Sequence, residues 1–347
     1  EVLMSRIVSV DSGSSFLKII VGNHIEQVPT FVVPASSTSV VSYDDEIIVD
    51  DKRYYVGETA KNATNKMIED PAIEAGFHGS EKQKIQMCFA FQLMGIMGDY
   101  ETLVVSLPYS DCRDDVVKNK LKARNIFKWK AYINNEWVDK YVSFKEIKIY
   151  PQGIGALRLF TSDLKEKPKS VCLVDIGSCT SDIISVQLDR RTNDYIYNAQ
   201  ASKSSREISV TDFMRKWAKE IKQAPGMKDR KFSYFELSDM AKHEDFLINI
   251  LSQPKFNSKP LFQETKKWFT NEIYTHAKEV LGDLWDGIEQ VILTSGGAYL
   301  IDESTWDCNG RTIKLDEWAN VKGQYIAFGG ILSKETKSNL KEKEVNL

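Results

Sequence analysis

Residues 170–184 read SVCLVDIGSCTSDII, and the prediction of the fold starts from this stretch. A run of apolar residues typical of a buried strand, 171–174, ends at the carboxylate of Asp175. A turn of small residues follows at 177–180, and then comes a second acid, Asp182. This pattern predicts a hairpin whose backbone can come close to a ligand.

Nearly the same pattern occurs near the N-terminus, where residues 6–22 read RIVSVDSGSSFLKIIVG. Asp11 ends the first apolar segment, and Lys18 lies in the second. Small residues let backbone N–H groups approach phosphate oxygens, and serine hydroxyls add further donors. An aspartate beside phosphates needs a cation between them, so we expect Asp11 and Asp175 to hold Mg²⁺ through its water molecules.

The two hairpins together predict a nucleotide site in a cleft between two domains. The expected phosphate ligands are Ser12, Gly13, Ser14, Ser15 and Lys18 in the first hairpin, and Gly177, Ser178, Cys179 and Thr180 in the second. A single Asp-x-Gly turn is weak evidence, because tight hairpins need glycine for steric reasons alone. Two copies in one chain are much more specific.

A third segment, residues 290–301, reads QVILTSGGAYLI and predicts a strand, a glycine turn and a helix. The backbone of Gly296, Gly297 and Ala298 offers a flat surface for a purine. The α-phosphate would then lie near the N-terminus of the helix.

The length of 347 residues is enough for about two domains. We expect an α/β protein in which residues 1–165 form one domain and 166–325 the second, with 325–347 packing back on the first. The charged linker around Pro168 marks the boundary. Further segments predict hairpins at 46–57 and 128–142, a strand at 101–108, and helices at 80–97, 209–223, 233–252, 261–282 and 327–334.

The composition excludes several classes of protein. The net charge of −3 gives no general attraction to nucleic acid or to anionic lipid. Five cysteines without a paired spacing argue against a disulfide framework or a zinc site, so we expect a cytoplasmic protein. No apolar stretch is long enough to span a membrane. The histidines are far apart in the sequence and are interpreted as surface or capping residues: His24, His78, His243 and His276.

Five motifs together resemble the actin-like ATPase superfamily. They are VDSGSSFLK, PQGIGAL, LVDIGSCTSD, LTSGGAYLI and, more loosely, AFGGIL, and they occur in the order phosphate 1, connect 1, phosphate 2, adenosine and connect 2. The motifs look most like those of the ParM/StbA plasmid-segregation actins and of related archaeal actin-like proteins. The resemblance implies an actin/ribonuclease-H-like fold of two mixed-sheet domains around a nucleotide cleft.

The resemblance also implies roles for single residues. Asp11 and Asp175 would organise Mg²⁺, and Gln152 occupies the position that orients the attacking water. As a neutral amide, Gln152 would position this water without deprotonating it. Phosphate 2 departs from the usual glycine-rich form at Ser178 and Cys179, and the adenosine turn has Ala298 where a third glycine is frequent. The choice between ATP and GTP therefore stays open.

The function implied by the resemblance is a filament that binds Mg-ATP and hydrolyses it to control filament turnover. Its expected partners are other copies of itself and a DNA-binding adaptor for plasmid or DNA segregation, without direct contact to nucleic acid or to a membrane. The alternative is a phosphotransfer enzyme of the sugar-kinase or exopolyphosphatase type. Such a kinase needs a carboxylate base near the acceptor hydroxyl, whereas this chain has Gln152 at the equivalent position.

Overall fold

The computed structural model describes residues 7–35, 45–64, 77–162, 164–249, 255–302, 306 and 311–332. These residues divide into two compact units. The chain passes from the first unit to the second after Lys165 and returns to the first at Trp318, before the position 325 expected from the sequence. The expectation that 325–347 packs on the first domain falls largely on 333–347, which lie outside the described residues.

The first unit contains a nine-stranded mixed sheet with the strand order β3-β2-β1-β7-β9-β8-β5-β6-β4. Its strands are β1 (Ile7–Ser12), β2 (Phe16–Val21), β3 (His24–Pro29), β4 (Val32–Pro34), β5 (Glu46–Val49), β6 (Lys52–Val56), β7 (Gly98–Leu107), β8 (Ile126–Ile133) and β9 (Glu136–Pro151). β1 runs parallel to β7, and β7 runs parallel to β9, so these three strands end at the same edge. That edge carries the first half of the candidate site.

Turn chemistry explains two of the hairpins in this sheet. Asp50 and Asp51 connect β5 to β6, and Asn134 and Asn135 connect β8 to β9. All four residues have positive φ, between 50° and 66°. Asparagine and aspartate tolerate this left-handed conformation, which two-residue hairpin turns require. The hairpins expected at these pairs are confirmed.

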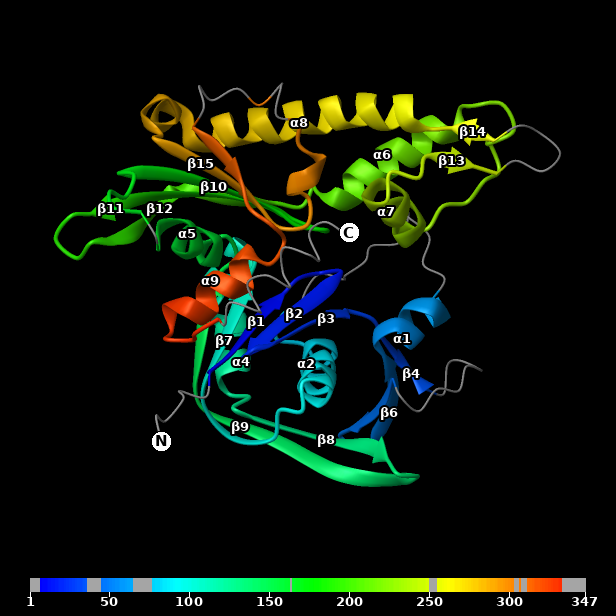
Figure 1. Cartoon of the computed structure of the whole chain (residues 1–347), viewed down its shortest axis with the longest axis vertical. Coiled ribbons are helices and arrows are strands. Elements are labelled where there is room, and N and C mark those ends of the chain that lie inside the picture. Colours follow the sequence, from blue (N-terminus) through cyan, green and yellow to red (C-terminus); the bar gives the residue numbers. More distant parts are fainter. Residues whose placement is uncertain are drawn as a thin grey trace. The chain divides into compact units, whose positions relative to one another are not determined.

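The helices of the first unit are α1 (Gly57–Thr64), α2 (Glu81–Leu93), α3 (Tyr109–Arg113), α4 (Asp115–Lys122), α5 (Ile154–Thr161) and α9 (Ala319–Ala327). The sheet curls around α2 (Figure 1). Residues 85–91 of α2 are buried without a break, because sheet surrounds the helix on several sides. Phe91, for example, packs edge-on against Phe127 of β8.

The second unit contains a five-stranded sheet with the order β12-β11-β10-β15-β16. Its strands are β10 (Ser170–Ile176), β11 (Ser181–Asp189), β12 (Asp194–Ser205), β15 (Gln290–Thr294) and β16 (Thr312–Lys314). A small separate pair is formed by β13 (Leu247–Ile248) and β14 (Phe256–Asn257). β10 pairs antiparallel with β11 and parallel with β15. The β10–β11 hairpin expected from the opening stretch of sequence is confirmed.

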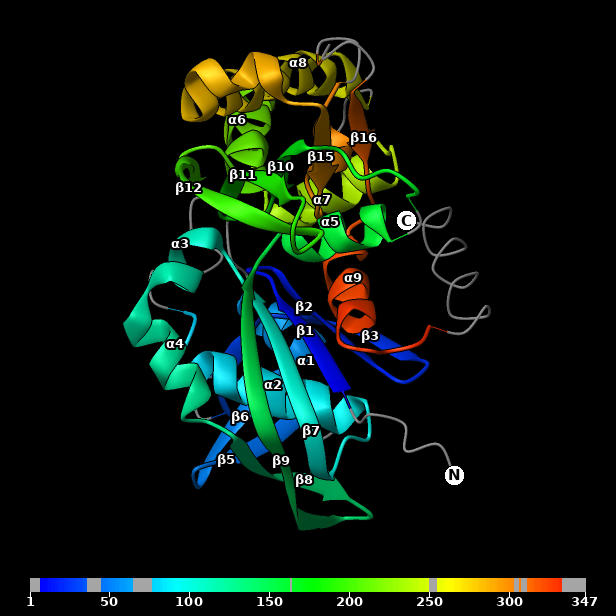
Figure 2. The ribbon, with the colours of Figure 1, turned by 90° about the vertical axis from the view of Figure 1, so that its left-hand side faces the viewer.

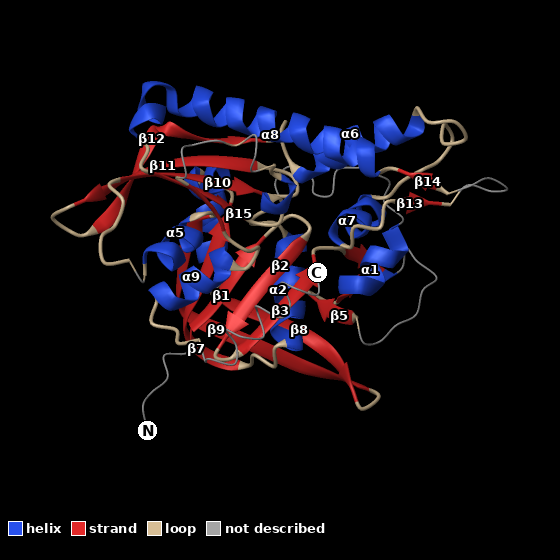
Figure 3. Cartoon of the chain, turned by 45° about the horizontal axis from the view of Figure 1, so that its top comes forward, coloured by secondary structure: helices blue, strands red, loops and turns tan. Residues whose placement is uncertain are grey.

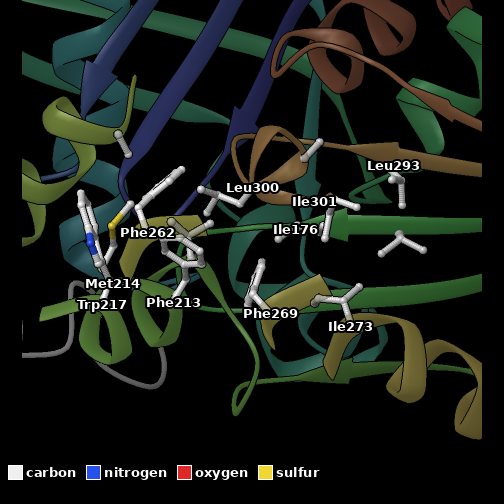
Figure 4. Close-up of a cluster of buried hydrophobic side chains, with 14 of the residues drawn as sticks. Ile176, Phe213, Met214, Trp217, Phe262, Phe269, Ile273, Leu293, Leu300 and Ile301 are labelled. Carbon is white, nitrogen blue, oxygen red and sulfur yellow. The ribbon is translucent and has the colours of Figure 1, made fainter. Parts of the chain in front are cut away.

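Three helices of the second unit are α6 (Val210–Lys222), α7 (Tyr234–Lys242) and α8 (Lys259–Leu281). α6 and α8 pack together over the five-stranded sheet (Figure 3). Between them lies an apolar core in which Phe213 and Trp217 of α6 contact Phe262 and Phe269 of α8 (Figure 4). Ile176, at the end of β10, belongs to the same core. The core therefore fixes the strand end from which the second turn begins.

Three expected helices differ from the structure. The helix expected at 233–252 ends at Lys242, after which Glu244 has the left-handed φ of 52°. The helix expected after the turn at 296–297 is only the 3₁₀ turn η3 (Ala298–Leu300). The helix expected at 327–334 is replaced by α9, which ends at Ala327. None of the described helices is long and apolar enough to cross a membrane.

Candidate functional site

In the first unit, three neighbouring strands bring polar side chains together at one edge of the sheet. Asp11 is the last residue but one of β1 and is 3% exposed. Its Oδ1 accepts a hydrogen bond of 2.5 Å from Ser106 Oγ of β7 and one of 3.2 Å from Gln152 Nε2, just after β9. The amide nitrogen of Gln152 faces the carboxylate, so its Oε1 is left to accept a hydrogen bond from water. This is the function expected of a residue that orients an attacking water.

Lys18 lies directly opposite Asp11 in the antiparallel β1–β2 pair. Directly opposed residues point to the same face of a sheet, so the ammonium and the carboxylate share one side of the hairpin. Both residues are buried, and Lys18 is 7% exposed. The hairpin thus places one cation and one anion beside the turn at 12–15.

Ser12 points away from the Asp11 side, because side chains alternate along a strand. Its hydroxyl is fully buried and accepts a hydrogen bond of 2.8 Å from Gln83 Nε2 of α2. Its carbonyl oxygen lies 3.0 Å from His78 Nε2, and His78 Nδ1 lies 2.5 Å from Asp111 Oδ2. The expectation that His78 is a surface or capping residue is therefore wrong, since it is buried and holds the backbone of the first turn.

Two further carbonyl groups of the first turn are also bound by the protein. Thr30 donates from Oγ1 to Ser14 O at 2.5 Å and from its backbone N–H to Ser15 O at 2.9 Å. Gly13 and Ser14 stay half-exposed at the tip. Ser15 Oγ is buried without a hydrogen-bond partner among the described residues, which is unusual for a buried hydroxyl. A phosphate oxygen would supply the missing partner.

In the second unit, Asp175 is the last residue but one of β10 and lies directly opposite Asp182 of β11. Both are buried, at 3% and 1% exposure. On its other side, Asp175 is level with Thr294 at the end of β15. Thr294 Oγ1 and the nearby Ser181 Oγ are buried without hydrogen-bond partners among the described residues. Two opposed carboxylates repel each other unless a cation or a proton lies near them.

The second turn rests on the N-terminus of α6. Backbone N–H groups of Val210 and Thr211 donate to the carbonyls of Gly177 and Ser178 at 3.1 and 3.0 Å. Thr211 Oγ1 adds a bond of 2.6 Å to the Ser178 carbonyl. Residues 177–180, which include Cys179 and Thr180, are all half-exposed. The carbonyls therefore point into the protein while the turn itself remains accessible.

Gly13 and Gly177 occupy equivalent positions in the two turns. A Cβ atom on Gly13 would lie 2.7 Å from Phe16 O, and one on Gly177 would lie 3.0 Å from Thr180 O. In each case the obstructing atom is the backbone oxygen three residues later. Each turn thus needs glycine for the same steric reason, which supports a repeated design.

The third motif lies beside the second turn, because Gly297 donates its N–H to Ile176 O at 2.9 Å. A Cβ atom on Gly297 would lie 2.3 Å from Ile176 Cγ2, whereas one on Gly296 would meet only Glu317 Oε2 at 3.7 Å. Gly297 is therefore needed for packing, and Gly296 has open space above it. Ala298 is buried and begins a 3₁₀ turn of three residues, too short to provide the expected helix terminus for an α-phosphate.

The carboxylates of these hairpins fit a cation that binds mainly through its own water molecules. Among the described residues there is no cluster of three or more His, Cys, Asp or Glu side chains that could enclose a metal. Mg²⁺ usually keeps several water molecules and takes only one or two carboxylates from the protein. Asp11 supplies one carboxylate in the first unit, and Asp175 and Asp182 supply two in the second, so each hairpin by itself matches that requirement. Ser15 Oγ in the first unit and Thr294 Oγ1 in the second are buried hydroxyls without a hydrogen-bond partner among the described residues.

Two family models match the chain in succession. Residues 9–155 match the model "Actin like proteins N terminal domain", and residues 173–305 match "Archaeal actin homologue MreB-like, C-terminal". The chain belongs to the actin-like proteins. The two mixed-sheet units are the fold that the five motifs predict, so the prediction of the fold is confirmed.

Solved structures agree with this family. A ParM filament of 15 strands from Clostridium botulinum is 18% identical, with a TM-score of 0.70 over 94% of this chain and 99% of that one. The pCBH ParM non-polymerisable quadruple mutant is 19% identical, with a TM-score of 0.71 over 93% and 98%. The archaeal actin homolog Ta0583 in complex with ADP is 17% identical, with a TM-score of 0.71 over 93% and 99%. No curated protein matches the chain by sequence.

Two residues in the candidate site of this actin-like protein were not indicated by the sequence motifs. Ser106 and His78 lie in unremarkable segments and join the site only through the sheet and the start of α2. Asp182 is different, because it follows Asp175 by the same seven residues that separate Lys18 from Asp11. That spacing was a usable signal.

Proposed function

We propose that this actin-like protein binds a magnesium nucleoside triphosphate, assembles into filaments and hydrolyses the nucleotide to control their turnover. The observation that carries the proposal is the repetition of one hairpin design: a buried aspartate at a strand end, a glycine packed on a backbone oxygen, and a half-exposed turn. The ADP complex of the archaeal homolog supports nucleotide binding, and the ParM filament supports self-assembly.

The turn residues would bind phosphate oxygens, with Ser15 supplying its unpartnered hydroxyl and Lys18 a positive charge. Asp11, Asp175 and Asp182 would hold the hydrated metal. Bound Mg²⁺ neutralises phosphate charge and so favours displacement at phosphorus. Gln152 would accept a hydrogen bond from the attacking water through Oε1, because its Nε2 is already bonded to Asp11.

A biological role in plasmid or DNA segregation is proposed from the resemblance to the ParM group. With a net charge of −3, the chain itself has no overall attraction to DNA. We therefore propose a separate DNA-binding adaptor as the link between filament and DNA. Pelleting the filament with plasmid DNA, in the absence of any other protein, should leave the DNA in the supernatant.

The deciding experiment combines light scattering and pelleting with a phosphate-release assay after addition of Mg-ATP or Mg-GTP. A rise in scattering above a threshold protein concentration, followed by decay as phosphate appears, is expected. Asp175→Ala should remain folded and release almost no phosphate, whereas Asp229→Ala, at an exposed position in the same unit, should behave as the wild type. Phosphate release without assembly at any concentration would instead favour a phosphotransfer enzyme and call for a screen of acceptor substrates.

A further inference from the structure

Helix α5 begins without a cap of its own. Its N-cap residue is Gly153, which has no side chain and a φ of 90°. The first N–H groups of a helix have no acceptors inside the helix, and a buried helix start needs them from elsewhere. Residues 151–157 are all buried, so water is not an easy substitute.

The missing acceptor comes from α9, far along the chain. Oδ1 of Asn320 accepts hydrogen bonds from Gly153 N at 2.8 Å and from Ala156 N at 3.3 Å. Asn320 is 1% exposed, so its side chain is committed to this position. Asparagine commonly caps the helix that it immediately precedes, and here Asn320 of α9 caps a different helix, α5.

A close crossing of the two helices makes this contact possible (Figure 2). A Cβ atom on Gly155 would lie 1.9 Å from Asn320 O, and one on Gly323 would lie 1.8 Å from Gly155 O. Both positions must therefore be glycine for the backbones to meet. At this separation the short side chain of Asn320 reaches the start of α5.

The capped residue is the immediate neighbour of Gln152. The backbone N–H of Gln152 donates to Leu107 O at 2.7 Å, and its side chain donates to Asp11. Gly153 N follows one peptide later and is fixed by Asn320. Gln152 is thus held by the sheet on one side and by Asn320 on the other, with the permissive Gly153 between them.

We propose that Asn320 is a positioning residue for hydrolysis, which holds Gln152 where it can orient the attacking water. The inference rests on the proposed function of the site. It assigns control of the hydrolysis rate to a residue of the C-terminal helix that lies outside all five sequence motifs. Affinity for nucleotide should depend on Asn320 far less, because the phosphate turns have supports of their own.

The test uses the full-length chain and four variants: Asn320→Ala, Asn320→Asp, Gln152→Ala and the double variant Gln152→Ala/Asn320→Ala. Phosphate release is measured in single turnover at saturating Mg-ATP, and the Kd is measured separately. Asn320→Ala should slow release by about ten- to a hundredfold, since small displacements of positioning groups have effects of this size. Its Kd should change less than threefold or so, well within one decade.

Asn320→Asp keeps the acceptor oxygen and should restore most of the rate. The double variant should be no slower than Gln152→Ala alone, because Asn320 acts through Gln152. The proposal would be overturned if the rate losses of the two single variants multiplied in the double variant, or if Asn320→Ala left the rate unchanged. Thermal unfolding checks that the Asn320→Ala chain is folded. Asn320→Ser serves as a milder substitution if alanine prevents folding.

Hydrogen exchange gives a readout independent of nucleotide. The amides of Gly153 and Ala156 should be protected in the wild type and exchange faster in Asn320→Ala, with Asn320→Asp protected again. Equal exchange in all three would overturn the capping role itself. A wild-type chain that shows this protection but never releases phosphate would refute the proposed function and, with it, the role of Asn320 in hydrolysis.

Discussion

Asp175 lies directly across the β10–β11 hairpin from Asp182, and both carboxylates are buried. At the same register position of the β1–β2 hairpin, Asp11 faces Lys18. The two hairpins pair their strands in the same register but differ in the charge of the residue that lies opposite the aspartate. The first hairpin places a basic residue opposite the aspartate, and the second places another acidic residue there.

This difference predicts opposite effects of neutralising substitutions on stability. Asp182→Asn should raise the free energy of unfolding of the nucleotide-free protein by about 1 kcal/mol, because directly opposed like charges are destabilising. The same variant should lose a part of the stabilisation given by Mg-nucleotide. Urea unfolding with and without Mg-ATP measures both quantities.

Lys18→Met is the matched substitution in the first hairpin. It removes the positive charge that lies opposite a buried carboxylate in the β1–β2 pair and should lower stability in the absence of nucleotide, by about 1–3 kcal/mol. If both variants shift stability in the same direction, the charge difference between the hairpins does not govern their stability. Equal stabilisation of wild type and Asp182→Asn by Mg-ATP would contradict the proposal that Asp182 helps to hold the metal ion.

Much of this site was predictable, because its main parts lie in local sequence patterns. Asp11 and Asp175 each follow an apolar run and precede small residues, so strand end, turn and carboxylate are all visible in a short window. Gln152 is indicated by the Pro-Gln-Gly segment before α5. The supports of these residues were not predictable in this way, because they come from distant segments that only the sheet order brings near.

Helix α9 shows a second reason why the sequence prediction was incomplete: the last helix was expected at 327–334. Gly323 lowers the helix propensity of 319–327, so the sequence favours a later start for the last helix. The structure shows that Gly323 is required inside the helix, because the backbone of Gly155 occupies the space of a side chain. A close approach of two helices can therefore look like a loop signal when only one of them is considered.

His78 should be needed for the shape of the first turn. Its ring nitrogens lie within hydrogen-bonding distance of the Ser12 carbonyl and the Asp111 carboxylate, so His78→Ala removes both contacts, one of them with a charged group. A loss of about 1.5–3 kcal/mol for such a bond corresponds to a Kd for Mg-nucleotide raised roughly tenfold or more. Isothermal titration of the folded variant measures this change.

Two variants control for indirect effects on the first turn. His243→Ala, at the exposed end of α7, should bind nucleotide as the wild type does. Asp111→Asn keeps an acceptor for Nδ1 and should show a smaller loss of affinity than His78→Ala. If His78→Ala lowers thermal stability but leaves the Kd unchanged, His78 supports the fold without shaping the phosphate site.

His276 of α8 should make the second unit sensitive to mild acid. Its pKa is lowered from the ordinary 6.5, first by burial, which penalises the imidazolium, and then by the nearby Lys203, against the opposing effect of Glu279 and Glu207. Below pH 6.5 the unfolded chain binds a proton that the folded chain does not yet bind. The free energy of unfolding should therefore fall as the pH drops below 6.5, until the folded-state pKa is passed.

Urea unfolding over this pH range measures the slope. His276→Leu should flatten it, since the group responsible is removed, whatever the change in stability at neutral pH. His24→Leu, at an exposed position of β3, should keep the wild-type slope. A slope that survives in His276→Leu would assign the acid sensitivity to other groups.

The two glycines of the third motif should separate packing from ligand binding. Gly297→Ala places a Cβ atom 2.3 Å from Ile176 Cγ2 and 2.8 Å from Ile176 O, so backbone must shift and stability should fall by about 1–3 kcal/mol.

Gly296→Ala meets only Glu317 Oε2 at an ordinary 3.7 Å and should unfold as the wild type does. Its effect should appear in the Kd for Mg-ATP instead, because the added methyl group occupies the open surface expected to face the nucleotide. Thermal unfolding and titration of both variants measure the two effects. A Gly296→Ala chain with wild-type affinity and stability would show that this surface does not contact nucleotide, and the search for the base site would move to other parts of the second unit.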